Sequence, residues 1–232
     1  MSRPTLSIVI PAYNEERFIG TLLKQIQDVD LDQLGIDKQV IVVDDCSKDR
    51  TSEIVSGFPS VRLRRLERNA GKGGAVRAGM ELATGDFLII QDADLEYDPQ
   101  DYIPMMRKML SGEAEIVYGS RYLGRGRHQN QSLMAYLGGR SLSLVALACT
   151  GTYLTDTVTA LKLFPRELLM SLTLTTSGFE LDHEITAKVV AKGCRIREVP
   201  VRYYPRSRDE GKKIGMRDWF IGCRTFWRFR RG

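Results

Sequence analysis

The chain has 232 residues, 43% of them hydrophobic, which is enough to bury a sizeable core in one large α/β domain. Its formal net charge of +5 and isoelectric point near 9.0 are compatible with phosphate-bearing ligands or an anionic membrane surface, but are too weak to indicate nucleic-acid binding. The four cysteines are scattered without metal-ligand spacing, which argues against a zinc site and against a disulfide framework.

No segment is expected to be a signal peptide or a membrane span. The N-terminal "MSRPTLSIVIPAYNEE" lacks the long apolar core of a signal peptide. No stretch approaches eighteen uninterrupted apolar residues, and the best candidate, "SLVALACTG", is too short. We therefore expect a cytoplasmic protein with reduced thiols.

The first sixty-odd residues are predicted to alternate between strands and helices. "LSIVIP" is a compact apolar run typical of a strand covered on both faces, and "QVIVVDD" is a second. Between them, Asn14 is expected to cap a helix whose apolar residues recur at helical spacing. "TSEIVSGF" begins a short helix, and "VRLRRLE" predicts a weaker third strand near an edge of the sheet.

The alternation continues to residue 120. "NAGKGGAVRAGMELATG" predicts a glycine-rich turn entering a helix that stops at Gly85, and "DFLIIQD" predicts a fourth strand. Asp98 and Pro99 are expected to start a helix that Gly112 ends, and "AEIVYGS" predicts a fifth strand. This pattern indicates an α/β fold with a Rossmann-like, mainly parallel sheet flanked by helices.

The pattern changes after residue 121. "RYLGRGRHQNQ" predicts a loop, and helices are expected over about 131–149, from about 165, and within "GFELDHEITAKVVAKG". "RIREVPVRYYP" predicts a strand, and the tail from 206 is basic. No linker is long enough to separate domains, so the chain is divided only into a main domain over 1–215 and a C-terminal amphipathic helix over 216–232.

Polar clusters follow four of the predicted strands: "PAYNEE", "DDCSKD", "DADLE" and "GSRY". In a parallel sheet these clusters meet at one edge, where ligands collect. Asp92 and Asp94 form the notable pair, because two carboxylates about 4 Å apart repel by roughly 4 kcal/mol at an effective dielectric of 20. A divalent cation removes this repulsion, and oxygen ligands without nearby His or Cys favour Mg²⁺ or Mn²⁺. A lone DxD is common, however, and its alternative reading is a turn with one solvated carboxylate.

The segment "NAGKGGA" offers backbone N–H groups at a helix start together with the ammonium of Lys72, a combination that suits phosphate. Its spacing is not that of a P-loop. No GxGxxG follows the first strand, which counts against a Rossmann dehydrogenase.

In combination these segments resemble glycosyltransferase family 2, whose members have the GT-A fold, use nucleotide-sugar donors and invert the transferred sugar. The likeness rests on "SIVIPAYNEE", "VIVVDDCSKDRT", "NAGKGGAVRAGMELATGDFLIIQDADLEYDP" and "YGSRY". Within the family the chain is most similar to the dolichyl- or polyprenyl-phosphate sugar synthases, and "TDTVTALKLFPRELL" and "FELDHEITAKVVAKGCRIREVPVRYYPRSRDEGKKIG" extend this likeness almost to the end.

The resemblance implies roles for the matched residues. Those lining the base and ribose pocket would be Pro11, Ala12, Tyr13, Glu15 and Asp44, and the nucleotide-sugar would also meet Lys72 and Ala93. A Mg²⁺ or Mn²⁺ ion on the donor diphosphate would be held by Asp92, Asp94 and Glu96, the last standing where the mannose synthases have glutamine. Arg121 would meet the acceptor phosphate, and Arg206 would reach the donor diphosphate.

The resemblance also implies a reaction, the transfer of a hexose from a donor of the GDP-mannose or UDP-glucose type to a polyprenyl or dolichyl phosphate. A metal ion and an arginine would stabilise the leaving diphosphate. A phosphate acceptor is already an anion, whereas a sugar hydroxyl needs a base, for which Asp182 and Glu184 are candidates. His183 is read as an ordinary residue. The alternatives are a family 2 enzyme acting on a saccharide hydroxyl, a non-catalytic nucleotide-sugar-binding subunit and, more distantly, a nucleotidyltransferase.

The C-terminal "MRDWFIGCRTFWRFRRG" predicts an amphipathic helix. One stripe of this helix is basic and comprises Arg217, Arg224, Arg228 and Arg231; the other is apolar and comprises Met216, Trp219, Phe220, Cys223, Phe226 and Trp227. Aromatic residues opposite arginines are typical of interfacial helices, and each basic group near an anionic leaflet contributes about 1 kcal/mol. We expect residues 216–231 to place the protein at the cytoplasmic membrane face. The alternative is that the apolar stripe docks on the main domain.

Overall fold

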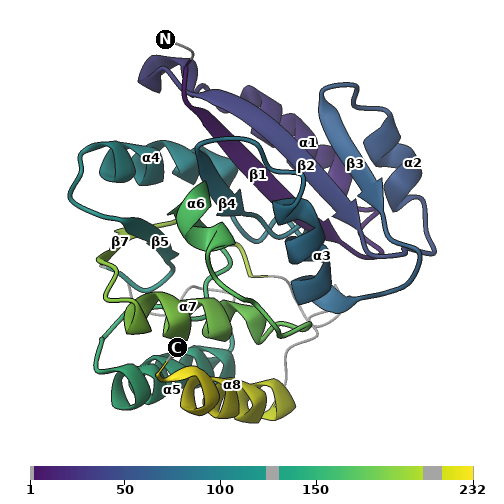
Figure 1. Cartoon of the computed structure of the whole chain (residues 1–232). Coiled ribbons are helices and arrows are strands. Elements are labelled where there is room, and N and C mark those ends of the chain that lie inside the picture. The colour runs from purple at the N-terminus through teal and green to yellow at the C-terminus, as the bar shows by residue number, and fades with distance from the viewer. Residues whose placement is uncertain (1–2, 124–130, 206–215, 232) are drawn as a thin grey trace.

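The computed structural model describes residues 3–123, 131–205 and 216–231. A seven-stranded sheet with the order β3-β2-β1-β4-β6-β5-β7 forms its centre (Figure 1). Neighbouring strands pair in parallel, except that β6 pairs antiparallel with both β4 and β5. The predicted α/β fold with a mainly parallel sheet is confirmed.

The strands lie close to their predicted positions, and the weak third strand is at an edge of the sheet as expected. Their bounds are β1 (Thr5–Ala12), β2 (Asp37–Asp44), β3 (Val61–Arg65), β4 (Phe87–Ile90), β5 (Ile116–Ser120), β6 (Lys162–Pro165) and β7 (Ile196–Pro200). Strand β6 was not predicted, because a four-residue segment that begins with Lys162 and directly precedes a helix has too little periodicity to distinguish strand from helix.

The helices are α1 (Ile19–Asp28), α2 (Thr51–Ser56), α3 (Gly71–Met80), α4 (Tyr102–Leu110), α5 (Leu133–Thr150), α6 (Arg166–Met170), α7 (Leu181–Ala191) and α8 (Met216–Phe229). Two 3₁₀ turns, η1 (Asp32–Leu34) and η2 (Pro99–Asp101), complete the described elements. Asp98 caps η2 by accepting a hydrogen bond from the Gln100 N–H, which leads into α4 as predicted.

Two predicted helix ends are wrong. Asn14 does not cap α1, which begins at Ile19; it has a φ of 56°, in the left-handed region, and its side chain accepts a hydrogen bond from the Lys48 N–H at 2.8 Å. Helix α3 ends at Met80, before Gly85. A Cβ at Gly85 would lie 2.6 Å from the Thr5 carbonyl oxygen, so this glycine is explained by a close backbone approach.

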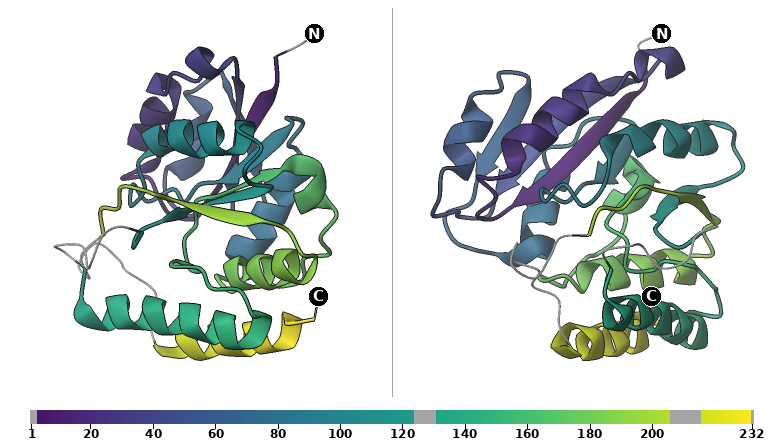
Figure 2. Two further views of the ribbon diagram at one scale, coloured as in Figure 1. Left: turned by 90° about the vertical axis from the view of Figure 1, so that its left-hand side faces the viewer. Right: turned by 180° about the vertical axis from the view of Figure 1, so that it is seen from behind.

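Apolar side chains fill both faces of the sheet. Because side chains alternate along a strand, Ile8 and Ile10 of β1 pack with α1 and α4 on one face, and Val9 packs with α3, α6 and α7 on the other. Figure 2 shows the resulting three layers from two further sides. This packing fixes the strand ends that form the site.

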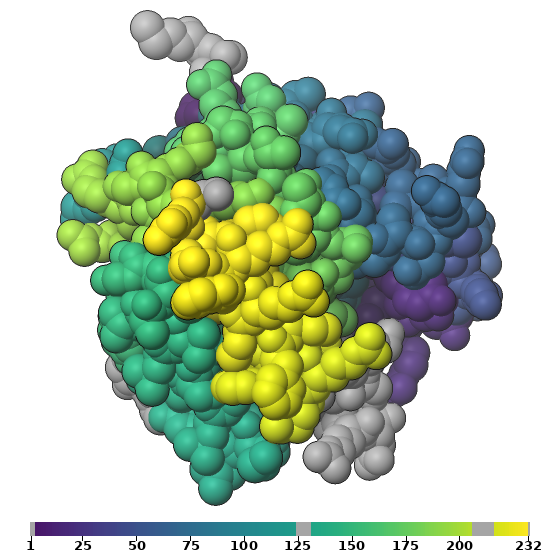
Figure 3. Space-filling model, turned by 60° about the horizontal axis from the view of Figure 1, so that its bottom comes forward, coloured from purple at the N-terminus to yellow at the C-terminus, as the bar shows by residue number. Residues whose placement is uncertain are grey.

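Helices α5 and α8 lie side by side beneath α7 and form one face of the molecule (Figure 3). A small apolar cluster joins them through Ala146, Ala187, Phe226 and Phe229. Helix α5 is only 17% buried, and its mean hydropathy is 1.3, so it has the length and composition of a membrane span. The expectation that no segment spans a membrane rested on the lack of an uninterrupted apolar run, which Arg140 breaks in α5, and it stays a prediction.

Candidate functional site

A cavity of about 750 Å³ lies beyond the carboxyl ends of the parallel strands, between the sheet and helices α5 and α8. In an open α/β sheet this is where ligands bind. Most of the residues expected from the sequence line this cavity: Pro11, Ala12, Tyr13, Glu15, Lys72, Asp92, Ala93, Asp94, Glu96, Arg121 and Asp182. The roles assigned to them stay predictions. Arg206 lies outside the described residues.

The exception is Asp44, which does not line the cavity. Its side chain is fully buried in the turn after β2, where it accepts hydrogen bonds from the Ser47 N–H and the Ser52 hydroxyl. The lining residue is its neighbour Asp45. Successive side chains along an extended strand point to opposite sides, so a one-residue error exchanges a turn-forming carboxylate for a cavity-lining one.

The predicted phosphate cradle at the start of α3 is also occupied by the protein itself. The Ala70 N–H donates to Asp45 Oδ1 at 2.6 Å, and the Gly73 N–H donates to the Ser177 carbonyl at 2.7 Å. A Cβ at Gly73 would lie 2.5 Å from the Thr176 carbonyl oxygen, so glycine is needed for this close packing. Lys72 lines the cavity together with Asn69, Gly71 and Ala75, and it is the charged side chain of this segment.

The acidic residues after β4 suit a divalent cation in chemistry, since all are oxygen donors. Asp94 accepts a hydrogen bond from the Glu96 N–H, and Glu96 accepts one from the Tyr203 hydroxyl at 2.9 Å. Within residues 3–123, 131–205 and 216–231, no three acidic, His or Cys side chains converge as a ready metal cluster. The predicted three-carboxylate shell is thus not preformed. Asp92 and Asp94 fit the common arrangement in which one or two carboxylates and a substrate diphosphate share the ion.

Asp182 lies between two lysines. Its Oδ2 is 3.1 Å from Lys72 Nζ, and its Oδ1 is 3.1 Å from Lys162 Nζ. Burial alone would raise the pKa of Asp182, but Lys162 and Lys72 together lower it to about 2. A carboxylate so strongly stabilised as an anion is a poor proton acceptor near neutral pH, so this geometry does not suit Asp182 to the role of base.

Glu184, the other candidate base, faces away from the cavity. Its fully buried carboxylate accepts hydrogen bonds from the backbone and hydroxyls of Thr175 and Thr176, and it pairs with Lys188 at 2.7 Å. Burial acts to raise the pKa of Glu184, whereas Lys188 and these hydrogen bonds lower it to about 2. Glu184 therefore fixes the loop before α7 and does not meet a substrate bound in the cavity.

Arg121 lies on the cavity wall directly after β5, as its predicted role requires. Its guanidinium is paired with the buried carboxylate of Asp156 and lies over the rings of Tyr122 and Tyr203. No local pattern singles out Asp156, which comes from the irregular segment before β6.

The far part of the cavity is apolar. Helix α8 contributes Met216, Asp218, Trp219 and Ile221, and helix α5 contributes Met134, Ala135, Gly138, Gly139 and Leu142; all of these but Asp218 are uncharged. We call this part the apolar arm. It is continuous with the charged part that contains Lys72, Asp92 and Arg121, so one cavity joins two chemically different ends.

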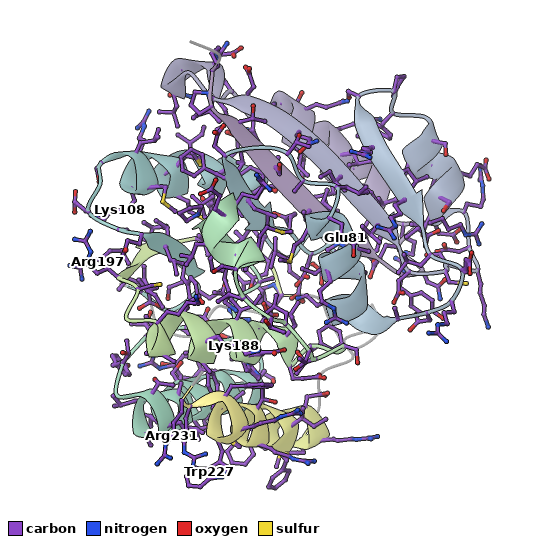
Figure 4. The ribbon with its side chains drawn as sticks, in the orientation of Figure 1. Glu81, Lys108, Lys188, Arg197, Trp227 and Arg231 are labelled. Carbon is purple, nitrogen blue, oxygen red and sulfur yellow. The ribbon has the colours of Figure 1, made fainter. Side chains whose placement is uncertain are left out.

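One part of the apolar stripe predicted on α8 docks on the main domain, and the other part is exposed. Phe226 is fully buried against the protein and Trp219 donates to the Ser141 hydroxyl, as expected for docking. Met216, Phe220 and Trp227 are each more than 60% exposed. In Figure 4, Trp227 and Arg231 lie at the outer side of the helix.

Comparison with protein families matches residues 7–169 to the model described as glycosyl transferase family 2. A dolichol-phosphate mannosyltransferase of Pyrococcus furiosus is 29% identical over 90% of this chain, which spans 59% of that protein's length. A UDP-N-acetylglucosamine–dolichyl-phosphate N-acetylglucosaminyltransferase of Methanococcus voltae is 27% identical, with 98% of this chain and 96% of that protein covered.

Among solved structures, glucosyl-3-phosphoglycerate synthase of Mycobacterium tuberculosis in complex with UDP is similar, with a TM-score of 0.71 and 22% identity. The likeness covers 98% of this chain and 80% of that one. At this level of identity it is a likeness of fold.

Proposed function

The chain belongs to glycosyl transferase family 2 and has the GT-A fold, and we propose that it transfers a hexose from a nucleoside-diphosphate sugar to a polyprenyl phosphate. That it is a glycosyltransferase follows from its family. The donor, the acceptor, the metal and the membrane contact are the proposed parts.

The cavity is the main support for this proposal, because its charged end suits the sugar donor and its apolar arm suits the lipid acceptor. The charged end offers Lys72, Asp92 and Asp94 to a sugar diphosphate, and the apolar arm, in which Asp218 is a charged exception, offers a mainly apolar surface to an isoprenoid chain. A saccharide acceptor would instead favour more hydrogen-bonding groups in this part of the cavity. The two dolichyl-phosphate enzymes among the relatives support the same acceptor class.

At the donor end, Asp92 and Asp94 would hold a Mg²⁺ or Mn²⁺ ion, which supplies charge stabilisation for the departing diphosphate. The mycobacterial relative in fold has been solved with each of these ions beside UDP, which supports a metal of this class. Lys72, 2.8 Å from Asp92, adds a positive charge from the protein itself. Tyr13 and Asp45 lie on the same side of the cavity, where the nucleoside would sit.

At the acceptor end, the structure suits an anionic nucleophile. A phosphate monoester needs to be positioned and does not need to lose a proton to a base. That no base is needed agrees with the state of Asp182 and Glu184, because neither carboxylate is suited to accept a proton. Arg121 lines the charged part of the cavity, and its guanidinium lies over the ring of Tyr122, which meets Gly139 of the apolar arm; an acceptor phosphate would be held here.

The face formed by α5 and α8 would rest on an anionic membrane (Figure 3). Its exposed apolar residues are Leu133, Met134, Leu137 and Leu144 of α5 and Met216, Phe220 and Trp227 of α8. Exposed arginines at 217, 224, 228 and 231 add attraction to anionic lipids. Because the apolar arm lies between the same two helices, this contact would bring a lipid-linked acceptor directly to the cavity.

The direct test offers radiolabelled GDP-mannose or UDP-glucose, with Mn²⁺, to the purified chain. Each reaction contains either vesicles with polyprenyl phosphate or a soluble saccharide acceptor. Label that moves into the lipid extract only in the vesicle reactions is the expected result. Label in the soluble saccharide would identify the alternative family activity, and nucleotide binding without any transfer would favour a non-catalytic subunit.

A further inference from the structure

Four charged side chains form a continuous chain across the wall of the cavity. Lys162 pairs with Asp182, Asp182 pairs with Lys72, and Lys72 pairs with Asp92, at distances of 3.1, 3.1 and 2.8 Å. They come from β6, α7, α3 and the end of β4. The two oxygens of Asp182 face different lysines, so this carboxylate is the central link.

Lys162 is at the edge of the sheet where the parallel strands end, because β6 is antiparallel and begins where its neighbours finish. Its side chain is fully buried, and it also donates to the carbonyls of Thr157 and Asp182, at 3.3 and 3.1 Å. These contacts occupy the three N–H donors of an ammonium group. Lys162 does not line the cavity, and a ligand there does not reach it.

Lys72, by contrast, lines the cavity, and its side chain is 9% exposed. Two of its three N–H donors face Asp92 and Asp182, which leaves one for a ligand. A donor diphosphate with its metal ion would also bind Asp92. If Asp92 were the only carboxylate partner of Lys72, this binding would remove the contact that holds the ammonium group in place. Asp182 supplies a second partner that lies deeper in the wall and is itself anchored by Lys162.

From this arrangement we propose that Lys162 and Asp182 are positioning residues, which hold the Lys72 ammonium group where it binds the diphosphate of the donor. The inference rests on the proposed function, since it takes the cavity to bind a nucleotide-sugar. Lys162 balances the charge of Asp182, so Lys72 is held without being fully neutralised. Lys162 thus acts on the donor through two intervening side chains.

A double-mutant cycle tests this coupling through the affinity for UDP and GDP, measured by calorimetry in the presence of MnCl₂. Lys72→Met and Asp182→Asn are each expected to weaken binding about tenfold. The double variant is expected to bind no more weakly than Lys72→Met alone, because Asp182 acts through Lys72. Losses that multiply to about a hundredfold would overturn the inference.

A second pair of variants separates positioning from folding. Lys162→Met leaves Asp182 without its anchor and is expected to lower both the Tm and the nucleotide affinity. Lys162→Met combined with Asp182→Asn removes the uncompensated buried charge, so the Tm should recover while the affinity stays low. An affinity that recovers together with the Tm would mean that both residues serve only the fold, and it would overturn the inference.

Lys188→Met is the matched control, since Lys188 forms a buried pair with Glu184 on the same helix but outside the cavity. It should lower the Tm and leave nucleotide affinity within twofold of wild type; an equal loss of affinity would overturn the inference. If the wild-type chain binds neither nucleotide, the proposed function is overturned as well. If the wild type binds normally but the affinity losses of Lys72→Met and Asp182→Asn are independent, only the positioning role is overturned.

Discussion

The guanidinium of Arg121 meets the carboxylate of Asp156 through two parallel hydrogen bonds, with Nε 2.7 Å from Oδ2 and Nη2 2.8 Å from Oδ1. Asp156 is fully buried and also accepts the Arg121 backbone N–H at 3.0 Å. This pair fixes the arginine on the cavity wall, over the ring of Tyr122.

Replacing Asp156 with Asn should therefore destabilise the protein strongly. Removing one partner of a buried ion pair leaves an uncompensated charge, which costs about 3–5 kcal/mol. Urea denaturation measures this difference. Glu113→Gln, which breaks the exposed pair with Lys108 labelled in Figure 4, is the control and should change the midpoint little. Equal effects of the two substitutions would contradict a structural role for the buried pair.

Asp94→Ala should abolish the stabilisation that a nucleotide and Mn²⁺ confer together. A ligand at a hundred times its Kd stabilises the native state by about 2.7 kcal/mol, which is readily visible in thermal unfolding. Glu81→Ala removes an exposed carboxylate at the end of α3 and should leave the ligand-induced shift intact. A full Mn²⁺-dependent shift in Asp94→Ala would place the metal elsewhere.

Glu184→Gln should reveal a pH-dependent contribution to stability. The pKa of this carboxyl is about 2 in the folded chain, below its ordinary value of 4.5, so the native state binds its proton later than the unfolded state does. Its stabilising effect is complete above about pH 5 and is lost as pH falls towards 2. Hydrogen bonds to a charged group contribute about 1.5–3 kcal/mol, so urea midpoints of wild type and variant should differ clearly at pH 7 and converge near pH 2. A constant difference across this range would contradict the assignment.

Replacing Phe220 and Trp227 with Ser should weaken binding to anionic vesicles, measured by sedimentation, by about a hundredfold or more, because each aromatic ring that enters the interface contributes roughly 1.5–3 kcal/mol. Leu110→Ser on α4 removes an apolar side chain of 46% exposure on a different helix and serves as the control. If the double variant and the wild type sediment alike, the membrane does not contact this side of α8.

The fold could be predicted largely because its strands are compact apolar runs separated by clear turn residues. The site could be predicted because parallel strands bring their carboxyl ends together, which places Tyr13, Asp92 and Arg121 around one cavity. Single-residue details could not be predicted. Asp44 and Asp45 are equivalent in sequence, and only the end of β2 determines which one faces the cavity.

Contacts between distant segments were equally inaccessible. Lys162 belongs to a short antiparallel strand that has no distinct periodicity, and its partner Asp182 lies twenty residues further along the chain. The apolar residues of α5 gave no indication that Gly138 and Leu142 would form a cavity wall with Trp219 of α8. Such pairings depend on tertiary packing, which local pattern does not encode.

The central claim is that the apolar arm accommodates the chain of a lipid acceptor, and Gly138→Leu tests it most directly. Gly138 lines the arm, and a Cβ there would meet no atom within 4 Å, so a side chain can leave the backbone at this position without a clash and occupy part of the arm. Ala148→Leu adds similar volume to an exposed site on the same helix, outside the cavity. The measurement is KM for polyprenyl phosphate. We predict an increase of about tenfold for Gly138→Leu alone, with unchanged nucleotide affinity, whereas equal KM values in both variants and the wild type would contradict the claim.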